Sequence, residues 1–390
     1  MRDMISRRRS GAGLRFTKIH LENWRNFASV DADLAQRVFL VGPNAAGKSN
    51  FLDVFRFLHD IVSVGGGLEE AVRKRLGISK IRSLSARRFP DVVIRVDLGD
   101  GGEQAWTYEL AVGNDSRQRP KIKRESVAQN GNVLLRRPDD EDKADPERLT
   151  QTYLQQVNVN KTFRPVADAF AAVHYLHVVP QLVREPDRSA GRTKDPYGGD
   201  FLEQVASTRD QTLKARLKHI SAALRVAVPQ LSGLELTRDT RGTPHLRGRY
   251  EHWRPQGAWQ TEDQFSDGTL RLLGLLWAIV EDGGALLLEE PELSLHPEVV
   301  RFLPQLFARM QRRSGRQILT STHSTDLLRD EGIGLDEVLL LIPTPEGTRV
   351  RAANTFREVR DLLSGGSTLA EAVMPLTRPR QAEQLALFGD

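Results

Sequence analysis

The sequence predicts an α/β fold in which a mixed sheet is combined with an antiparallel β subdomain and a helical lobe. Three observations predict it. An apolar strand runs into a glycine-containing loop and a helix over residues 38–62, and alternating apolar and polar segments fill 91–137. Strand, helix and strand joined by short connections follow over 285–320. Such a unit forms a right-handed parallel crossover.

The first half of the predicted main domain covers residues 14–140. Alternating apolar and polar residues indicate strands with one buried face, and apolar residues at helical spacing predict a helix over 48–62. An Asn-Gly pair between short β-like segments is typical of a hairpin turn. The expected strands are 14–21, 38–41, 92–98, 106–112 and two short segments about Asn130-Gly131.

The middle segment, 141–262, is expected to form a mostly helical lobe. The acidic, proline-containing stretch 139–147 is interpreted as a solvated loop. From about 147 to 230 the apolar spacing is mostly helical, with a polar loop at 185–199, and residues 233–263 are polar and strand-like.

The second half of the main domain is expected at residues 263–375. Its apolar patterns predict helices over 270–280 and 299–310, and buried strands over 285–288 and 318–320. A basic tail, 1–13, and a flexible tail, 376–390, complete the chain.

The composition excludes several classes of protein. Hydrophobic residues make up 39% and charged residues 27% of the chain, a balance typical of globular rather than disordered proteins. The longest strongly apolar stretch, 272–280, has nine residues, whereas a bilayer requires about 20. We therefore expect no membrane segment and a cytoplasmic location. Because cysteine is absent, disulfides, thiolate zinc sites, iron–sulfur clusters and thiol catalysis are excluded.

The chain is basic, with a formal charge of +5 and a pI near 9.5, which favours a polyanionic partner. An arginine-rich composition is the alternative explanation. Seven basic residues and no acid lie between 73 and 88. Such a cluster neutralises phosphates, so these residues are candidate contacts for double-stranded DNA, although a solvated basic face is equally consistent. The candidates are Arg73, Lys74, Arg75, Lys80, Arg82, Arg87 and Arg88.

Residues 42–49, G-P-N-A-A-G-K-S, match the phosphate-loop pattern G-x-x-x-x-G-K-[ST] between a predicted strand and a predicted helix. In such a loop, backbone amides and the helix N-terminus surround the β-phosphate. Lys48 is expected to reach the β/γ oxygens and Ser49 to bind Mg²⁺. The sequence thus predicts ATP and Mg²⁺ as ligands. The expected nucleotide-binding residues here are Asn44, Ala45, Gly47, Lys48, Ser49 and Asn50.

A buried strand ends in acids at 285–292, A-L-L-L-E-E-P-E. Carboxylates at the carboxyl edge of a sheet lie where α/β proteins bind ligands. We expect Glu289 to hold Mg²⁺, directly or through water, and Glu290 to orient and deprotonate the attacking water. A plain acidic cluster on the surface is the alternative.

Two further signals are weaker in isolation. Ser266 and Gly268 precede an apolar helix, and a hydroxyl and an amide at a helix start form an anion site. An ordinary helix N-cap is the alternative. His323 follows a short buried strand, where it is either a catalytic residue or a histidine of the core or surface.

The order of these motifs resembles that of ABC-type ATPases of the RecF/SMC/OLD branch, and within it the AAA-like ATPases without a long coiled coil. The resemblance covers residues 14–60 and 262–345. The matching motifs are the N-F-R-S-F-like start at 19–27, the signature at 266–271, the acidic motif and D-loop at 290–297, and the switch histidine at 322–324.

This resemblance implies an ATP-dependent homodimer with active sites shared between two copies. Lys48 and Ser49 of one copy would hold ATP, and Ser266 and Gly268 of the other would cap the γ-phosphate. His323 would sense that phosphate, and Arg25 would lie near the nucleotide. Two departures are visible: Glu289 stands where most relatives have Asp, and no Q-loop glutamine follows the first helix at the expected place.

The expected function is that of a RecF-like ATPase with slow turnover that acts on DNA in repair or in defence against phage. One alternative is an ATP-gated scaffold that controls a separately encoded nuclease or toxin subunit. Another, the motor subunit of a membrane transporter, is disfavoured by the start at 24–27 and the signature at 266–269. The stretch 324–390 is too short for the Toprim nuclease domain of OLD-type proteins.

The C-terminal residues Gln384–Phe388, Q-L-A-L-F, resemble the peptide that bacterial replication proteins insert into the sliding clamp. A tail with apolar anchors is suited to docking, so the clamp is a candidate partner. Packing of this tail onto its own domain is the alternative.

Overall fold

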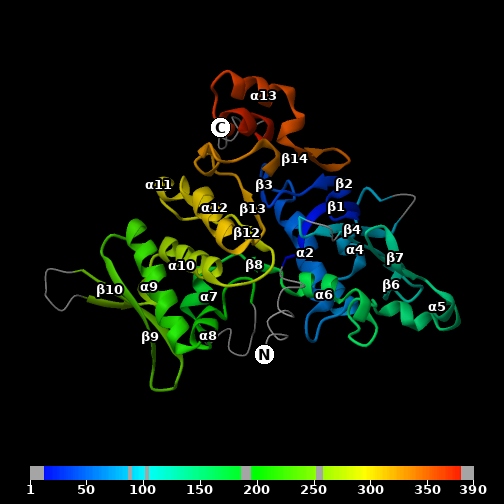
Figure 1. The fold of residues 1–390 in the computed structure, drawn as a ribbon, viewed down its shortest axis with the longest axis horizontal. Coiled ribbons are helices and arrows are strands. Elements are labelled where there is room, and N and C mark those ends of the chain that lie inside the picture. Colours follow the sequence, from blue (N-terminus) through cyan, green and yellow to red (C-terminus); the bar gives the residue numbers. More distant parts are fainter. Residues whose placement is uncertain (1–12, 87–89, 102–104, 186–194, 252–257, 379–390) are drawn as a thin grey trace, which may run out of the picture.

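A computed structural model gives the fold and describes residues 13–86, 90–101, 105–185, 195–251 and 258–378 (Figure 1). Its central sheet has six strands in the order β15-β14-β3-β13-β12-β8. The strands from β14 to β8 are parallel to their neighbours, and β15 is antiparallel to β14. The strands are β3 (Arg37–Val41), β8 (His174–Leu176), β12 (Leu286–Glu289), β13 (Ile318–Thr322), β14 (Val338–Thr344) and β15 (Gly347–Ala352).

A second sheet of six antiparallel strands has the order β2-β1-β4-β5-β6-β7. The hairpin between β6 and β7 turns at Asn130 and Gly131, whose φ angles of 49° and 82° are those that an Asn-Gly turn supplies. The strands are β1 (Arg15–Trp24), β2 (Phe27–Asp33), β4 (Val92–Gly99), β5 (Ala105–Asn114), β6 (Pro120–Gln129) and β7 (Asn132–Arg137).

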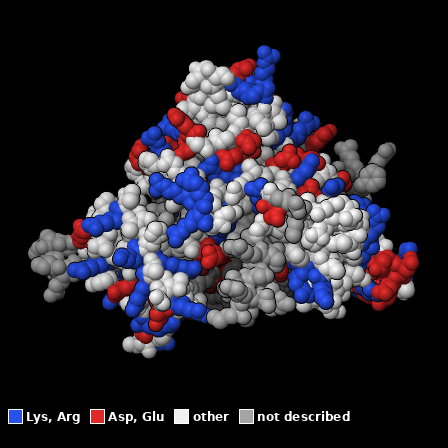
Figure 2. All heavy atoms as spheres, viewed as in Figure 1, with Lys and Arg blue, Asp and Glu red and all other residues white. Residues whose placement is uncertain are grey.

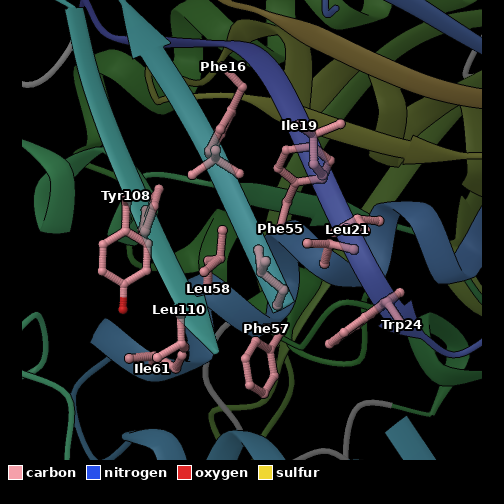
Figure 3. Close-up of a cluster of buried hydrophobic side chains, with 14 of the residues drawn as sticks. Phe16, Ile19, Leu21, Trp24, Phe55, Phe57, Leu58, Ile61, Tyr108 and Leu110 are labelled. Carbon is pink, nitrogen blue, oxygen red and sulfur yellow. The ribbon is translucent and has the colours of Figure 1, made fainter. Parts of the chain in front are cut away.

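Helix α2 (Lys48–Val62) packs its apolar residues against the antiparallel sheet (Figure 3). The ring centroids of Phe16 on β1 and Phe55 on α2 are 4.7 Å apart in an edge-to-face arrangement. Strand β3 contributes to two cores, because alternate side chains point to opposite faces. Val38 and Leu40 belong to the core that contains α2, whereas Phe39 and Val41 belong to the core that contains α10.

The other face of the central sheet is covered by α10 (Asp267–Val280) and α12 (Leu303–Ser314), with α9 (Asp210–Ala227) packed against α10 (Figure 1). A three-stranded sheet in the order β11-β10-β9 lies against α9. At 18 residues, α9 is the longest helix in the described ranges. The strands of this sheet are β9 (Leu231–Arg238), β10 (Pro244–Tyr250) and β11 (Ala258–Thr261).

Shorter helices complete the fold. The α-helices are α3 (Leu68–Arg73), α4 (Ile78–Ile81), α5 (Asp140–Ala144), α6 (Arg164–Ala171), α7 (Pro180–Arg184), α8 (Phe201–Ala206), α11 (Pro297–Val300), α13 (Arg357–Ser364) and α14 (Leu369–Val373). The 3-10 helices are η1 (Pro146–Thr150), η2 (Asn160–Thr162), η4 (Glu262–Gln264), η5 (Leu327–Arg329), η6 (Leu335–Glu337), η7 (Ala353–Thr355) and η8 (Met374–Thr377). No helix within the described ranges is both long enough and apolar enough to cross a bilayer.

The predicted fold class is confirmed, with two local corrections. The stretch 139–147 is exposed for the most part but is not a loop, because it forms α5 and the start of η1; Asp142 of α5 is buried and accepts hydrogen bonds of 2.8 and 2.9 Å from Arg137. The predicted helical lobe also contains a strand of the central sheet, since β8 pairs with β12. With three residues, β8 is too short to produce a recognisable alternation within helical sequence.

Candidate nucleotide-binding site

Four parallel strands bring three predicted groups, the phosphate loop, Glu290 and His323, to one edge of the central sheet, together with His177, which the sequence did not single out. The phosphate loop follows β3, Glu290 follows β12, His323 follows β13, and His177 follows β8. Because these strands are parallel neighbours, their carboxyl ends lie side by side. This edge is where open α/β sheets bind ligands.

The phosphate loop has the backbone of an anion cradle. Ala45 and Gly47 have φ angles of 63° and 98°, in the left-handed region that turns successive amides toward one side. Lys48 is buried and donates to the carbonyl oxygens of Gly42 at 3.0 Å and Pro43 at 3.4 Å. Its ammonium group therefore lies folded over the loop at which phosphate oxygens are expected. Asn44, Ala45 and Ser49 are exposed on this loop.

Asn26 fixes the phosphate loop from behind, a role that the sequence did not reveal. Its Nδ2 donates to the carbonyl oxygen of Ala46 at 2.9 Å and to Oγ1 of Thr348 at 2.8 Å. Its Oδ1 accepts from Nδ2 of Asn50 at 2.8 Å, so the Asn50 side chain is directed toward Asn26. A Cβ atom on Gly47 would lie 2.3 Å from Nδ2 of Asn26. Only glycine therefore fits beside Asn26.

Glu289 and Ser49, the two residues predicted as Mg²⁺ ligands, lie in contact with each other. Ser49 Oγ donates to Oε1 of Glu289 across the gap between α2 and β12. A hydroxyl and a carboxylate beside a phosphate loop are suitable ligands for Mg²⁺, which prefers oxygen. The second oxygen, Oε2, accepts from the Tyr175 hydroxyl. Burial, reinforced by the Glu289 charge, raises the pKa of Tyr175, so its hydroxyl remains a donor.

Strand β8 brings two further polar side chains to Glu289. Tyr175 lies in β8, and His177 follows it with Nδ1 3.3 Å from the carbonyl oxygen of Glu289. The strand could be recognised only from its pairing with β12, which is set by residues more than 100 positions away.

Glu290 lies between the phosphate loop and His323. Its Oε1 is 3.8 Å from Nζ of Lys48 and 3.3 Å from Nδ1 of His323. The backbone is held in the left-handed region, at a φ of 44°, by hydrogen bonds from the Glu290 amide to the carbonyl and hydroxyl oxygens of Ser321 at 3.1 and 3.2 Å. This unusual conformation lets the chain turn directly after β12, with the carboxylate beside Lys48.

Glu292 supports His323, another role that the sequence did not reveal. Its Oε1 accepts from Oγ1 of Thr322 at 2.6 Å and from the backbone amide of His323 at 3.3 Å. The side chain is buried, and burial raises the pKa of this carboxyl group. Oε2 is buried without a hydrogen-bond partner in the described part of the chain. Glu292 thus fixes the backbone that carries His323.

Ser266 is the N-cap of α10, the alternative that its sequence left open. Its Oγ accepts from the amide of Thr269 at 3.2 Å, while the residue itself remains exposed. A Cβ atom on Gly268 would lie 2.4 Å from the carbonyl oxygen of Ser294 in the D-loop, so glycine is required there. Among the described residues, no hydrogen bond or ion pair joins Ser266 or Gly268 to the phosphate loop of the same copy.

Arg25 lies next to the start of α2, in a left-handed conformation at a φ of 52°. Its Nη2 donates to Oδ2 of Asp53 at 2.9 Å. Asp53 also binds Arg75 at 2.7 Å, and Arg75 is only 6% exposed. Burial acts to raise the pKa of Asp53, but the Arg75 guanidinium outweighs it and holds that pKa below its ordinary value. The prediction that Arg75 contacts DNA is therefore wrong.

The other basic residues of the 73–88 cluster divide into two groups. Arg73 pairs with Glu70 at 2.7 Å and Lys74 with Asp60 at 2.8 Å. Lys80 and Arg82 are exposed and have no ion-pair partner in the described ranges. Arg87, Arg88 and the clamp-like peptide Gln384–Phe388 lie outside the described residues.

The phosphate loop, the paired acids after β12 and the histidine after β13, all on one edge of a mostly parallel sheet, define a P-loop ATPase of the ABC type. Residues 37–330 match the family described as "AAA domain, putative AbiEii toxin, Type IV TA system", and the chain belongs to this family. A search of curated proteins finds no match.

Solved structures confirm the resemblance to SMC heads at the level of the fold. One is the SmcHead bound to the C-winged helix domain of ScpA, with 12% identity, a TM-score of 0.53, and coverage of 86% of this chain and 97% of that one. Another is the Smc head domain with a coiled coil and joint derived from Pyrococcus yayanosii. It has 11% identity, a TM-score of 0.51, and coverage of 91% of this chain and 100% of that one.

Proposed function

We propose that this protein binds and hydrolyses ATP and that ATP closes it on a second copy of itself. The arrangement around Glu290 carries the proposal. One carboxylate stands between the phosphate-loop lysine and a histidine, at 3.8 and 3.3 Å, next to the Ser49–Glu289 pair. These are the groups needed to bind a triphosphate, activate a water molecule and respond to the γ-phosphate.

Each residue has a distinct role in this proposal. Lys48 leaves the carbonyl oxygens of its own loop to bind β- and γ-phosphate oxygens. Ser49 and Glu289 would hold Mg²⁺, which supplies positive charge to the phosphate oxygens when bound. Glu290 accepts a proton from the attacking water, and His323 Nδ1, which faces the same carboxylate, keeps it directed at the phosphate.

The signature residues support an active site completed by a second copy. Ser266 is exposed at the start of α10, where the amides of Gly268 and its neighbours provide anion-binding donors. It makes no hydrogen bond to the phosphate loop of its own copy within the described ranges. We infer that Ser266 and Gly268 reach the γ-phosphate held by Lys48 of the partner, so that closure depends on ATP.

Double-stranded DNA is the polyanion that we propose as ligand. Between 299 and 325 the sequence has five arginines and no acid. Apart from the buried Arg316, they are exposed on α12 or just before it, where Figure 2 shows Lys and Arg atoms gathered on the surface. Arginines in a row along a helix can follow successive phosphates. The exposed members are Arg301, Arg309, Arg312 and Arg313.

Light scattering on Glu290→Gln, with and without ATP, tests the proposed function. Without its base the variant is expected to retain ATP and to accumulate as a closed dimer, whereas the wild-type protein returns to a monomer as ATP is consumed. Ser266→Arg in the same background is the matched control, because it blocks the partner site and leaves Lys48 intact. Wild-type turnover by Glu290→Gln would show that the base is assigned incorrectly.

The family description provides one specific reason for a second candidate, because it names a toxin and a toxin–antitoxin system. In this case ATP binding would gate a separately encoded toxin or nuclease subunit. The two candidates differ in their response to DNA. A DNA-dependent enzyme hydrolyses ATP faster when duplex is added and binds duplex with a steep salt dependence. A gating scaffold co-purifies with its effector, and its turnover does not respond to DNA.

A further inference from the structure

The two oxygens of the Glu289 carboxylate have different partners. Oε1 accepts from Ser49 Oγ, and Oε2 accepts from the Tyr175 hydroxyl. Glutamate is one methylene longer than aspartate, so it has an additional rotatable bond to restrain if its carboxylate is to stay in one place. The Tyr175 hydroxyl supplies such a restraint from the side opposite Ser49.

Tyr175 is itself held firmly. It pairs in register with Leu287 on β12, so its side chain lies on the same face of the sheet as Glu289, two residues further along. The guanidinium carbon of Arg56, on α2, lies 4.1 Å from the centre of the Tyr175 ring. The tyrosine is 9% exposed. Its hydroxyl is therefore a fixed point relative to β12.

The segment after β8 holds the backbone of Glu289 as well. His177 Nδ1 lies 3.3 Å from the carbonyl oxygen of Glu289, and the ring of Tyr197 packs edge-on against His177 with centroids 6.2 Å apart. Both the main chain and the side chain of Glu289 are thus bound by residues of one short segment. None of these residues reaches the phosphate loop by a hydrogen bond in the described ranges.

We propose that Tyr175 is a positioning residue for the divalent cation: it retains Oε2 of Glu289 so that Oε1 alone is presented beside Ser49. This inference rests on the proposed Mg²⁺-dependent ATPase function. It explains how glutamate can act as a metal ligand at a position where the resemblance implies aspartate. The Tyr175 hydroxyl holds the longer side chain in one conformation. Hydrogen-bond partners of a metal ligand commonly change metal affinity by about 10- to 100-fold.

Binding of Mn²⁺, followed by the electron paramagnetic resonance of the free ion, tests this inference without turnover. The full-length protein is saturated with a non-hydrolysable ATP analogue and titrated with Mn²⁺. Tyr175→Phe, which removes one oxygen and keeps the ring under Arg56, is expected to weaken Mn²⁺ binding about 10-fold. Binding of the analogue in EDTA is expected to match wild type, because Lys48 and the loop are unchanged.

Tyr197→Phe is the matched control. Tyr197 also lies near Arg56, at 5.9 Å from its ring centre, but its hydroxyl makes no hydrogen bond to Glu289. Because phenylalanine keeps the ring that packs against His177, this variant is expected to bind Mn²⁺ as wild type does. Glu289→Asp provides a second check, since the shorter side chain withdraws from Tyr175. In that background Tyr175→Phe should cause little further loss, so the two changes are not additive.

Three results would overturn the inference. Tyr175→Phe could bind Mn²⁺ as tightly as wild type, or it could lose affinity for the analogue in EDTA to the same extent, which would indicate a packing role only. Additive losses for Tyr175→Phe and Glu289→Asp would show that the phenol does not act through Glu289. The proposed function fails separately, if wild-type protein with the analogue takes up no Mn²⁺ at all.

Discussion

Lys48 and His323 approach the same oxygen of Glu290, the lysine Nζ at 3.8 Å and the histidine Nδ1 at 3.3 Å. Lys48 is the first residue of α2, which follows β3, and His323 comes directly after β13. The two side chains meet at Glu290 because β3, β13 and β12 are parallel neighbours. The buried Nζ of Lys48 also donates to the carbonyl oxygens of Gly42 and Pro43.

Lys48→Met is expected to weaken ATP binding at least 100-fold, because the only buried side-chain cation of the phosphate loop is lost. The change should not unfold the protein, since it removes a buried charge and keeps the aliphatic length. Isothermal titration gives the affinity, and a thermal melt gives the stability. Lys80→Met, at an exposed lysine without an ion pair, is the control. Wild-type affinity in Lys48→Met would exclude the loop as the nucleotide site.

The sequence was sufficient to place the residues whose position is set by their neighbours along the chain. Gly47, Lys48 and Ser49 follow a strand and begin a helix, and Glu290 follows a buried strand, so their neighbours along the chain indicate their place. Tyr175 could not be found in this way, because its role depends on Glu289, which is 114 positions away in the sequence. Tertiary pairing of a three-residue strand creates that contact.

The basic cluster at 73–88 shows a different failure, in which a residue was assigned a role that the fold rules out. A run of cations without acids suggests an exposed face, yet Arg75 is buried because Asp53 and Asp60, both on α2, turn toward it. These partners could not be recognised from the sequence near Arg75, because they lie 22 and 15 positions away. The charge pattern of a single segment predicts its surroundings only where the rest of the fold leaves it in solvent.

Glu292→Ala is expected to lower the turnover number about 10-fold while leaving ATP affinity within about 2-fold of wild type. The physical reason is that Glu292 accepts hydrogen bonds from the His323 amide and the Thr322 hydroxyl, so its loss frees the backbone that carries the histidine. Glu292→Gln keeps an acceptor oxygen and should retain most of the activity. Steady-state kinetics distinguish the two; equal activity in both variants and wild type would contradict the assigned role.

Arg75→Met is expected to destabilise the protein by about 3 kcal/mol, because it removes the buried cation that Asp53 and Asp60 share and leaves them only the more exposed Arg25 and Lys74. Arg73→Met, two residues away, removes only an exposed pair with Glu70 and should change stability by less than about 0.5 kcal/mol. Urea unfolding monitored by circular dichroism measures both. Equal stability of the two variants would show that the Arg75 pair does not support α2.

His245 on β10 makes a pH-dependent contact with η4, the short segment just before α10. Its Nδ1 lies 2.6 Å from Oε1 of Glu262, in η4, and Asp239 and Asp263 add negative charge nearby. The hydrogen bond to Glu262 raises the pKa of His245 above its ordinary value of 6.5. A raised pKa in the folded state means that the stabilisation is complete below pH 6.5 and is lost as the pH rises through the folded value.

A double-mutant cycle with His245→Gln and Glu262→Gln isolates this contact from the second bond of Glu262, which accepts from the Leu246 amide at 2.8 Å. The coupling free energy of unfolding is expected to be about 1 kcal/mol at pH 5.5 and to approach zero at pH 9. Urea titrations at both pH values measure it. Between pH 5.5 and pH 9 the His245 imidazolium loses its proton. A coupling energy that stays constant or grows over this range would therefore show that Glu262 does not stabilise the imidazolium form.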